Sequence, residues 1–465
     1  MVVGLSAASL AFVYAPEYVT PALAALGAAL LYPQAASLWR RRQMGKVVVR
    51  RPVYATAHSL SRLRSTVESY NLSSQPDVPG LVDYLLHQAV LASASDIHLV
   101  PYRDFAQVRF RVDGVLTDVA QMTGAMREPV TNRLKVLSGA IVFVHDRPQD
   151  GRLDVMVGER PVDVRAAFMP TLHGERVVLR ILDRAEVEEG LGSLGFTEDQ
   201  VTVFSDALLR SQGMIILNGP TGSGKTTTIY TALRAILDHK QQSASIYTLE
   251  DPIEYDLMNI NQTQTDEAQG FTFAQGLRTM LRQDPDVIMV GEIRDLETAR
   301  IAIQAGMTGH LIISTVHSKQ SAAVFVRLVE MGVDPHSIAS AVTAVVAQRL
   351  VRLLCSHCKR RVPVTPGEQA KLGGRSLDGE YFAAVGCEKC NMKGYAGRRG
   401  VFEVLLVDER LRELIQERAS PDRLYRAAIE NGMTTLIDNG LRFAAEGLTS
   451  LDEVLRHLPP EQRSA

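Results

Sequence analysis

The stretch Gly219-Pro-Thr-Gly-Ser-Gly-Lys-Thr226 decides the fold of this chain. It fits the pattern G-x-x-x-x-G-K-[ST] and lies between a short apolar run, residues 214–217, and a helical pattern, residues 226–239. An ordinary strand-to-helix turn is the alternative, but the fixed positions and both flanks favour a phosphate-binding loop. In such a loop, backbone N–H groups and the helix N-terminus hold phosphate oxygens. The sequence therefore predicts a nucleotide-binding domain.

Short apolar runs on both sides of this loop predict a parallel sheet. Strands are expected at residues 214–217, 245–248, 287–290 and 311–314. Uniformly apolar strands of this length are typical of parallel sheets with helices on both faces. The third run delivers Glu292 to its carboxyl end, where ligands bind in open α/β sheets. We expect Glu292 to orient and deprotonate the attacking water, the alternative being an exposed acid at a strand end.

The charge balance of the chain argues against nucleic-acid binding. The 465 residues include 50 Lys and Arg against 52 Asp and Glu, so no basic excess is present and we expect no nucleic-acid partner. A chain of this length predicts about two to four domains. With 22% charged and 46% apolar residues, the composition is that of a folded globular protein.

The first 45 residues differ from the rest and predict membrane association. Glu17 is the one charged residue before Arg40, and residues 18–39 form a mostly apolar run that could span a bilayer. Basic residues follow, so such a span would keep the remainder cytoplasmic. Pro21 and Pro33 leave open the alternative of hydrophobic helices that pack on another subunit or a membrane partner.

Composition also divides the chain before the phosphate-binding loop. Residues 46–80 are polar and rich in serine, which predicts a helix followed by a linker. Residues 81–190 combine helical spacing with period-2 strands and predict a small α+β domain. The glycine-containing stretch 190–195 is expected to be a hinge before the nucleotide-binding core, residues 200–348.

All four cysteines lie in two C-x-x-C pairs, Cys355 with Cys358 and Cys387 with Cys390. Two such pairs are typical of a structural zinc site, closed by four thiolates and without an open position for chemistry. Free buried thiols are the alternative. Paired cysteines of this kind indicate a reducing compartment, which favours the cytoplasm. We predict a tetracysteine zinc subdomain over residues 349–402 and a helical region over residues 403–465.

Ordered motifs make residues 80 to 450 resemble a known family, the secretion ATPases of type II secretion and type IV pilus assembly, the GspE and PilB group. Besides the phosphate-binding loop, the resemblance rests on Ala94-Ser-Asp-Ile-His98, Arg111-Val-Asp-Gly114, His173-Gly-Glu-Arg176, Leu249-Glu-Asp-Pro-Ile-Glu254, Gly291-Glu-Ile-Arg-Asp295, Thr308-Gly-His-Leu-Ile-Ile-Ser-Thr-Val-His317, Gln348-Arg-Leu-Val-Arg352 and Gly394-Tyr-Ala-Gly-Arg-Arg-Gly400. The resemblance implies a multidomain α/β fold: a small α+β domain, a RecA-like P-loop ATPase core and a zinc-binding tetracysteine subdomain.

The resemblance also implies an ATP and Mg²⁺ site. Residues expected to contact nucleotide in the loop are Gly219, Pro220, Thr221, Gly222, Ser223, Gly224, Lys225, Thr226 and Thr227. Lys225 is expected to reach the β and γ oxygens and Thr226 to hold Mg²⁺. The acidic segment with Glu250, Asp251 and Glu254 resembles the family's Asp box, and Glu292 resembles the Walker B glutamate. His310 and His317 match the family's His box, whereas an isolated histidine on an apolar strand is more often structural.

Five arginines resemble the family's nucleotide-contacting arginines. Arg165 and Arg180 lie in the predicted N-terminal domain, and Arg278, Arg282 and Arg294 lie in the core. Arginine stabilises the charge that develops on a transferred phosphoryl group, often across a subunit boundary. Solvated surface charges or ion pairs are the alternative for each.

The predicted function is that of an ATP-hydrolysing homohexamer. It would drive assembly of a type IV pilus or a type II secretion pseudopilus at the bacterial inner membrane, with a platform protein and pilins or pseudopilins as partners. Retraction ATPases of pili usually lack the tetracysteine module, which favours assembly. The alternatives are a DNA-uptake or DNA-translocating motor and a non-catalytic ATP-binding scaffold. The short hydrophobic N-terminus departs from the family's longer soluble docking domain, which leaves the mode of docking open.

Overall fold

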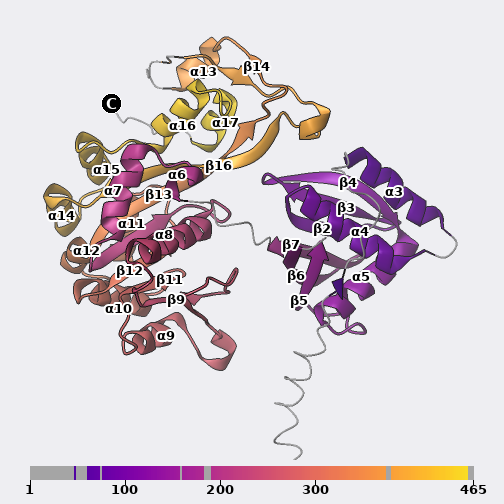
Figure 1. Ribbon diagram of the computed structural model, residues 1–465, viewed down its shortest axis with the longest axis horizontal. Helices are drawn as coiled ribbons and strands as arrows, with labels where there is room; N and C mark the ends of the chain where they lie inside the picture. The colour runs from indigo at the N-terminus through magenta and orange to yellow at the C-terminus, as the bar shows by residue number, and fades with distance from the viewer. Residues whose placement is uncertain are drawn as a thin grey trace, which may run out of the picture.

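The chain folds into two sheet-based units, each with its own apolar core (Figure 1). The computed structural model describes residues 47–48, 60–73, 76–157, 160–182, 190–372, 377 and 379–458. Residues 18–39, predicted to associate with the membrane, lie outside them. In the described residues no helix is long and apolar enough to cross a bilayer.

The N-terminal unit is a seven-stranded sheet with the strand order β1-β5-β6-β7-β2-β3-β4. Its neighbouring strands are antiparallel except for the parallel pair β1 and β5. Strands β5 and β7 alternate more buried and more exposed side chains, as is typical of a sheet that packs one face on its core. Its elements are β1 (Val47–Val48), α3 (Leu60–Leu72), α4 (Val78–Leu91), β2 (Ala94–Pro101), β3 (Phe105–Val112), β4 (Val115–Thr123), α5 (Gly124–Ser138), β5 (Gln149–Val157), β6 (Arg160–Thr171) and β7 (Gly174–Leu182).

Helix α3 lies in the segment predicted as a polar helix and linker, residues 46–80, yet it packs into this unit. Leu63 and Val67, one helical turn apart, are buried in the same core as strands β2 to β7. The packed unit therefore includes residues upstream of the expected start at residue 81. Two apolar positions at helical spacing were enough to bury one face of an otherwise polar helix.

The second unit is also built on seven strands, in the order β10-β9-β11-β12-β8-β13-β16. All neighbouring pairs are parallel except β13 and β16, which form an antiparallel hairpin. Its elements are α6 (Leu191–Leu194), α7 (Glu198–Leu208), β8 (Gly213–Asn218), α8 (Lys225–His239), β9 (Ile246–Glu250), β10 (Asn261–Gln264), η2 (Glu267–Gln269), α9 (Phe273–Met280), β11 (Val287–Val290), α10 (Leu296–Met307), β12 (Leu311–Val316), α11 (Ala323–Glu330), α12 (Pro335–Ala341), β13 (Val342–Leu354) and β16 (Tyr395–Leu406).

The four strands predicted from short apolar runs are confirmed as β8, β9, β11 and β12. All residues of β8, β11 and β12 are buried, because helices cover both faces of the sheet. The sheet does not end near residue 348, since β13 runs through that residue to Leu354 and β16 pairs with it. The cysteine-bearing segment is an insertion between these strands and contains β14 (Arg360–Arg361), α13 (Pro366–Lys371), β15 (Phe382–Ala383) and η3 (Glu388–Cys390).

The stretch 190–195, expected to be a hinge, is part of the second unit. It forms α6, and both Leu191 and Leu194 are buried in the core that contains β8 and α8. Phe196, directly after it, stacks on Phe402 of β16 with ring centroids 3.6 Å apart. Two leucines three positions apart thus anchor the glycine-rich stretch in the second unit, and a hinge at this place stays a prediction.

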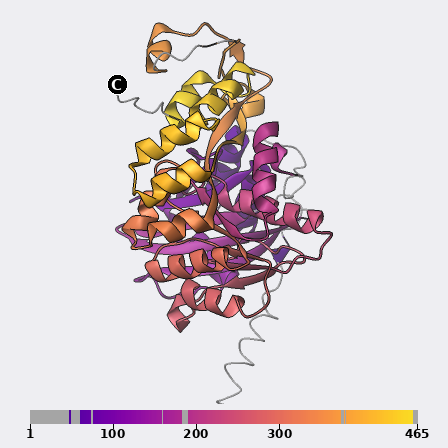
Figure 2. The ribbon, with the colours of Figure 1, turned by 90° about the vertical axis from the view of Figure 1, so that its left-hand side faces the viewer.

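The four C-terminal helices pack on the second unit in two pairs. They are α14 (Glu409–Gln416), α15 (Pro421–Glu430), α16 (Leu436–Ala445) and α17 (Leu451–His457). Helices α14 and α15 pack with α11 and α12 in one core, and α16 and α17 pack on β13 and β16. Figure 2 shows these yellow helices gathered together beside the sheet.

Candidate nucleotide site and tetracysteine site

The loop between β8 and α8 has the backbone conformation that a phosphate-binding loop needs. Gly222 and Gly224 have positive φ values of 76° and 89°, which L-residues rarely adopt. A Cβ at Gly224 would lie 2.8 Å from Nε2 of Gln348, so the site has no room for a side chain. Helix α8 begins at Lys225, and its N-terminus faces the loop. Ser223 Oγ is buried and has no hydrogen-bond partner among the described residues, which suits a polar ligand here.

The loop lysine is held against its own backbone. Lys225 Nζ donates to the carbonyl oxygens of Gly219 at 2.8 Å and Pro220 at 3.1 Å. Burial lowers the pKa of Lys225, Glu292 raises it in part, and Arg349 lowers it further. The two hydrogen bonds place the ammonium group inside the loop that it would share with phosphate oxygens.

Glu292 lies two residues after β11, at the carboxyl edge of the sheet, and is surrounded by basic groups. Its Oε1 pairs with Nη2 of Arg294 at 2.5 Å, and its Oε2 lies 3.9 Å from Nε2 of His317. His317 follows β12, and its Nδ1 donates to Gly219 O at 3.0 Å. Thus Glu292 and His317 meet near the start of the loop, as the carboxyl ends of neighbouring parallel strands allow, and Arg294 pairs with Glu292 there from the exposed side.

Glu250 is placed at the same edge but is buried inside the protein. It is 3% exposed and accepts hydrogen bonds from Tyr230 of α8, from Thr248 Oγ1 at 2.5 Å and from Gln262 Nε2 at 3.1 Å. Burial, together with the Glu250 charge, raises the pKa of Tyr230. Both oxygens of Glu250 are therefore engaged by donors beneath the loop. The more exposed acids of this segment are Asp251 and Glu254.

Arg165 reaches from the N-terminal unit to this acidic segment. Its Nη2 donates to the carbonyl oxygen of Ile253 at 2.7 Å and lies 4.0 Å from Glu254 Oε2. Burial lowers its pKa, while Glu254 raises it. Arg180 is the cross-strand neighbour of Arg165, but it pairs with Asp96 at 3.2 Å instead. Of these two arginines, Arg165 is the one that bridges the units.

Besides Arg180, three predicted site residues do not meet the loop within this chain. His310 lies before β12, whose six residues separate it from His317, so the two histidines stand at opposite edges about 20 Å apart. Its Nδ1 lies 3.2 Å from Ala305 O. Arg282 follows α9 toward the start of β11, at that same far edge. Arg278 is exposed and pairs with Glu297 of α10 at 2.5 Å.

Gln348 is a further residue of the site, to which the sequence motifs had assigned no role. It is 2% exposed, accepts from Thr228 Oγ1 at 2.9 Å, and donates to Ser223 O at 2.7 Å. It therefore fixes the loop to α8 from strand β13. The signal available in the sequence was a polar residue within an otherwise apolar strand pattern, in the motif that begins at Gln348.

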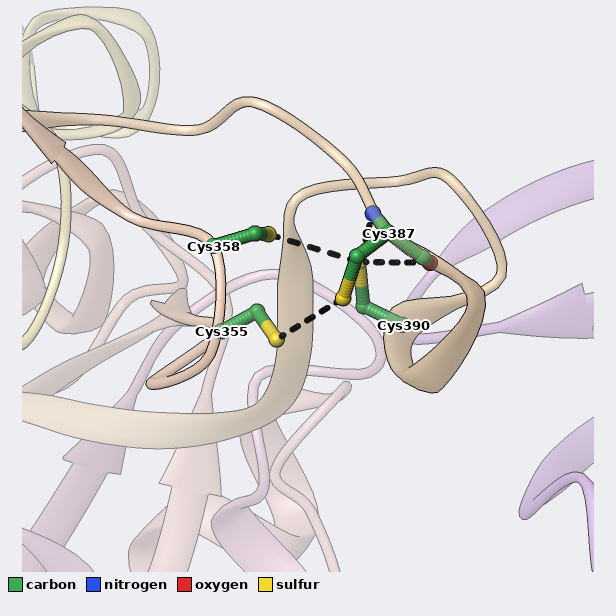
Figure 3. A group of neighbouring side chains, drawn as sticks. All are labelled: Cys355, Cys358, Cys387 and Cys390. Atoms are coloured by element: carbon green, nitrogen blue, oxygen red, sulfur yellow. Dashed lines mark hydrogen bonds between the residues drawn. The ribbon is translucent and has the colours of Figure 1, made fainter.

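The four cysteines converge in the insertion between β13 and β16, as Figure 3 shows. Their Sγ atoms all lie within 4.8 Å of one another. The spacing is 3.9 Å for Cys355 and Cys387, 3.7 Å for Cys358 and Cys390, and 3.8 Å for Cys387 and Cys390. These three distances are close to the roughly 3.8 Å edge of a tetrahedron of sulfurs around Zn²⁺, whose Zn–S distance is about 2.3 Å in structural sites.

Backbone groups also prepare these sulfurs for a metal. The N–H groups of Cys387 and Gly394 donate to Cys390 Sγ at 3.1 and 3.2 Å. The N–H of Gly386 donates to Cys358 Sγ at 3.3 Å. Donors of this kind stabilise thiolate, the form that binds metal. The residues present therefore fit a Zn²⁺ ion held by four thiolates.

A comparison with known families identifies the chain. The model of a family described as "Type II/IV secretion system protein" matches residues 71–456. The chain belongs to this family. The match spans both sheet-based units and the cysteine-bearing insertion, and it confirms the resemblance drawn from the motifs.

Relatives of this secretion-family chain are named as secretion and pilus ATPases. Type II secretion system ATPase E of Vibrio cholerae is 43% identical over 393 residues, which cover 83% of this chain and 76% of the relative. Type II secretion system protein E of Aeromonas hydrophila is 42% identical over 388 residues, covering 83% and 77%. Type IV pilus assembly ATPase PilB of Pseudomonas aeruginosa is 42% identical over 380 residues, covering 81% and 66%.

Solved structures agree on the fold of the family. The ATPase DotB of Legionella pneumophila superposes with a TM-score of 0.61 at 19% identity and covers 81% of this chain and 94% of that one. The pilus retraction motor PilT with bound ADP superposes with a TM-score of 0.53 at 23% identity, covering 82% and 97%. The predicted multidomain α/β fold with a parallel-sheet core is thereby confirmed.

Proposed function

We propose that this secretion-family ATPase hydrolyses ATP at the loop after β8 and uses the energy to assemble a type IV pilus or a type II secretion pseudopilus. The observation that carries the proposal is the convergence of Lys225, Glu292 and His317 at the carboxyl edge of one parallel sheet. The names of the relatives support the polymer-assembly role.

The side chains divide the work of hydrolysis among them. Lys225 binds the β and γ oxygens after it leaves the two loop carbonyls to which it now donates. Glu292 orients water and accepts its proton, with Arg294 and His317 fixing the direction of the carboxylate. Thr226 would hold Mg²⁺, and the ion would supply positive charge to neutralise the phosphates. Glu250 acts from below by holding α8 through Tyr230.

Arg165 gives hydrolysis a connection to domain movement. Its guanidinium holds Ile253 O and faces Glu254, so movement of the acidic segment changes a contact between the two units. A guanidinium also stabilises the charge on a transferred phosphoryl group. Four predicted site residues lie away from the loop of their own chain: Arg180, Arg278, Arg282 and His310. In a homohexamer, these residues would contact a neighbouring subunit.

The tetracysteine site has a structural role in this proposal. Zn²⁺ bound by Cys355, Cys358, Cys387 and Cys390 would crosslink the two ends of the insertion. With four protein ligands, the ion would have no open coordination position for chemistry. The docking partner is an inner-membrane platform protein at the cytoplasmic face. Reduced thiols are consistent with that compartment.

Replacement in the host tests the proposal. Lys225→Ala and Glu292→Gln are expected to abolish filaments or export, while the matched exposed variant Glu330→Gln is expected to behave as wild type. Surface filaments, exported proteins and DNA uptake are measured in parallel. Loss of filaments identifies a pilus motor, and loss of export with filaments intact identifies a secretion motor.

Purified Glu292→Gln that hydrolyses ATP as fast as wild type would refute the catalytic assignment, and hydrolysis stimulated by DNA would favour a DNA motor.

A further inference from the structure

The loop that follows β12, residues 317–321, lies against the start of the phosphate-binding loop. His317 Nδ1 donates to Gly219 O at 3.0 Å, and the N–H of Ser318 donates to Asn218 Oδ1 at 2.9 Å. His317 also faces Glu292. The position of the 317–321 loop therefore decides where His317 stands relative to the candidate base.

Arg349 reaches this loop from the other side of β8. In the sheet, β8 lies between β12 and β13, and Arg349 belongs to β13. Its Nη1 donates to Gln348 O at 2.9 Å and its Nη2 to Lys319 O at 3.2 Å. The guanidinium thus ties β13 to the loop that follows β12, near the end of β8. Gln348 at the same place holds the phosphate-binding loop through Ser223 O.

Glu403 of β16 holds the far end of the same loop. It is 2% exposed and accepts hydrogen bonds from Ser321 Oγ, from Tyr425 OH at 2.7 Å and from the N–H of Leu436 at 3.2 Å. Tyr425 belongs to α15, and Leu436 is the first residue of α16. Glu403 therefore joins the 317–321 loop to two C-terminal helices in one buried cluster.

Arg349 and Glu403 are neighbours on one face of the β13–β16 hairpin. Glu403 stands opposite Ala347, and Arg349 stands opposite Val401, so the two charged side chains are diagonal neighbours. Burial raises the pKa of Glu403, while its three donors and Arg349 lower it. Burial lowers the pKa of Arg349, and Glu403 raises it. Glu403 is buried and Arg349 is half-buried, so these polar side chains are costly compared with apolar packing unless their hydrogen bonds are made.

We propose that Arg349 and Glu403 are positioning residues for hydrolysis, which hold the 317–321 loop over the phosphate-binding loop and transmit its nucleotide-dependent position to α15 and α16. This inference rests on the proposed ATP hydrolysis. His317 is correctly placed only while both ends of its loop are tied. A shift of the loop on nucleotide binding then pulls on Lys319 and Ser321, and through Arg349 and Glu403 on the C-terminal helices.

The test uses the full chain with Arg349→Gln, Arg349→Lys and Glu403→Gln. Arg410→Gln is the matched exposed control on α14. Arg349→Gln and Glu403→Gln are expected to lower kcat about 10- to 100-fold through misplacement, with affinity for a fluorescent ATP analogue changed by less than about threefold. Arg349→Lys keeps the charge and a donor for Lys319 O and is expected to recover part of kcat. If one of these variants fails to fold, Ser321→Ala takes its place, because it removes only the hydrogen bond from Ser321 to Glu403. It should also lower kcat.

Hydrogen exchange gives a readout that does not need hydrolysis. A non-hydrolysable ATP analogue is expected to protect amides of residues 424–437 in wild type and to protect them less in Arg349→Gln. A wild-type protein that does not hydrolyse ATP would overturn the proposed function. The exchange measurement would still show whether Arg349 transmits nucleotide binding to α15 and α16. The inference is overturned if kcat of Arg349→Gln and Glu403→Gln stays within about twofold of wild type, if affinity falls in parallel with kcat, or if the exchange pattern is unchanged.

Discussion

Replacing Cys358 by serine is the most direct test of the tetracysteine site. The spacing of the sulfur atoms, 3.7 to 3.9 Å for the measured pairs, leads to a definite expectation for the wild type. It should carry one zinc ion per chain with four sulfur neighbours at about 2.3 Å. Cys358→Ser removes one of these four thiolates, so the zinc content should fall well below one per chain.

The same change should loosen the insertion and spare the core. Between Cys355 and Cys390, the buried apolar side chains of the described residues are Leu372 and Tyr381. Two such side chains contribute about 3 to 6 kcal/mol when fully buried, which is too little to order a segment of this length without the metal. Proteolysis within residues 356–394 should therefore become at least about tenfold faster. The melting temperature of the core should shift by only about a few degrees.

Metal analysis, X-ray absorption and limited proteolysis together check this expectation. His357→Ala is the matched control, because His357 lies inside the first pair, is exposed, and contacts Ser356 rather than a cysteine. It should keep the zinc and the proteolytic pattern. A wild-type protein that purifies without metal, a mixed nitrogen and sulfur coordination shell, or a Cys358→Ser variant with unchanged proteolysis would each refute the reasoning.

Three further predictions follow from single contacts. Glu453→Gln should destabilise the C-terminal helices by about 3 kcal/mol in chemical denaturation, because Glu453 is 1% exposed and accepts from Arg352 Nε at 2.9 Å. Burial raises the pKa of Glu453, but the hydrogen bonds from Arg352 outweigh burial and hold that pKa below its ordinary value of 4.5. The stability that the charged Glu453 contributes is therefore present above pH 4.5 and is lost as the pH falls further. A Glu453→Gln variant with the same acid sensitivity as wild type would contradict the assignment. Tyr230→Phe should cost about 1 to 3 kcal/mol, measured in the same way, since it leaves the buried Glu250 with one donor fewer, and an unchanged midpoint would count against that network. His317→Gln should lower kcat at least about tenfold and His310→Gln by less than about threefold, since only His317 reaches Gly219 and Glu292; equal losses would show that His310 acts at the site.

Local patterns in the sequence were sufficient wherever neighbouring residues decide the outcome. The phosphate-binding loop, the four buried parallel strands and the two cysteine pairs depend on spacing and on apolar runs, which the chain carries over a few residues. Segments with mixed signals were harder. Helix α3 has only a few apolar positions, and the 190–195 stretch carries glycines that favour a turn, yet Leu63 and Leu191 are buried by neighbours distant in sequence.

The sequence by itself determined the P-loop α/β core, the family and the cysteine cluster, because each is written in short motifs. Only the tertiary structure decided which polar residues meet. The His-box motif contains a six-residue strand, and a strand carries its two ends to opposite edges of a sheet, so His317 reaches the loop and His310 does not. Glu250 is buried because its side chain points to the face that α8 covers. Arg349 and Glu403 become neighbours only when β13 pairs with β16, since strand register depends on contacts that no local pattern contains.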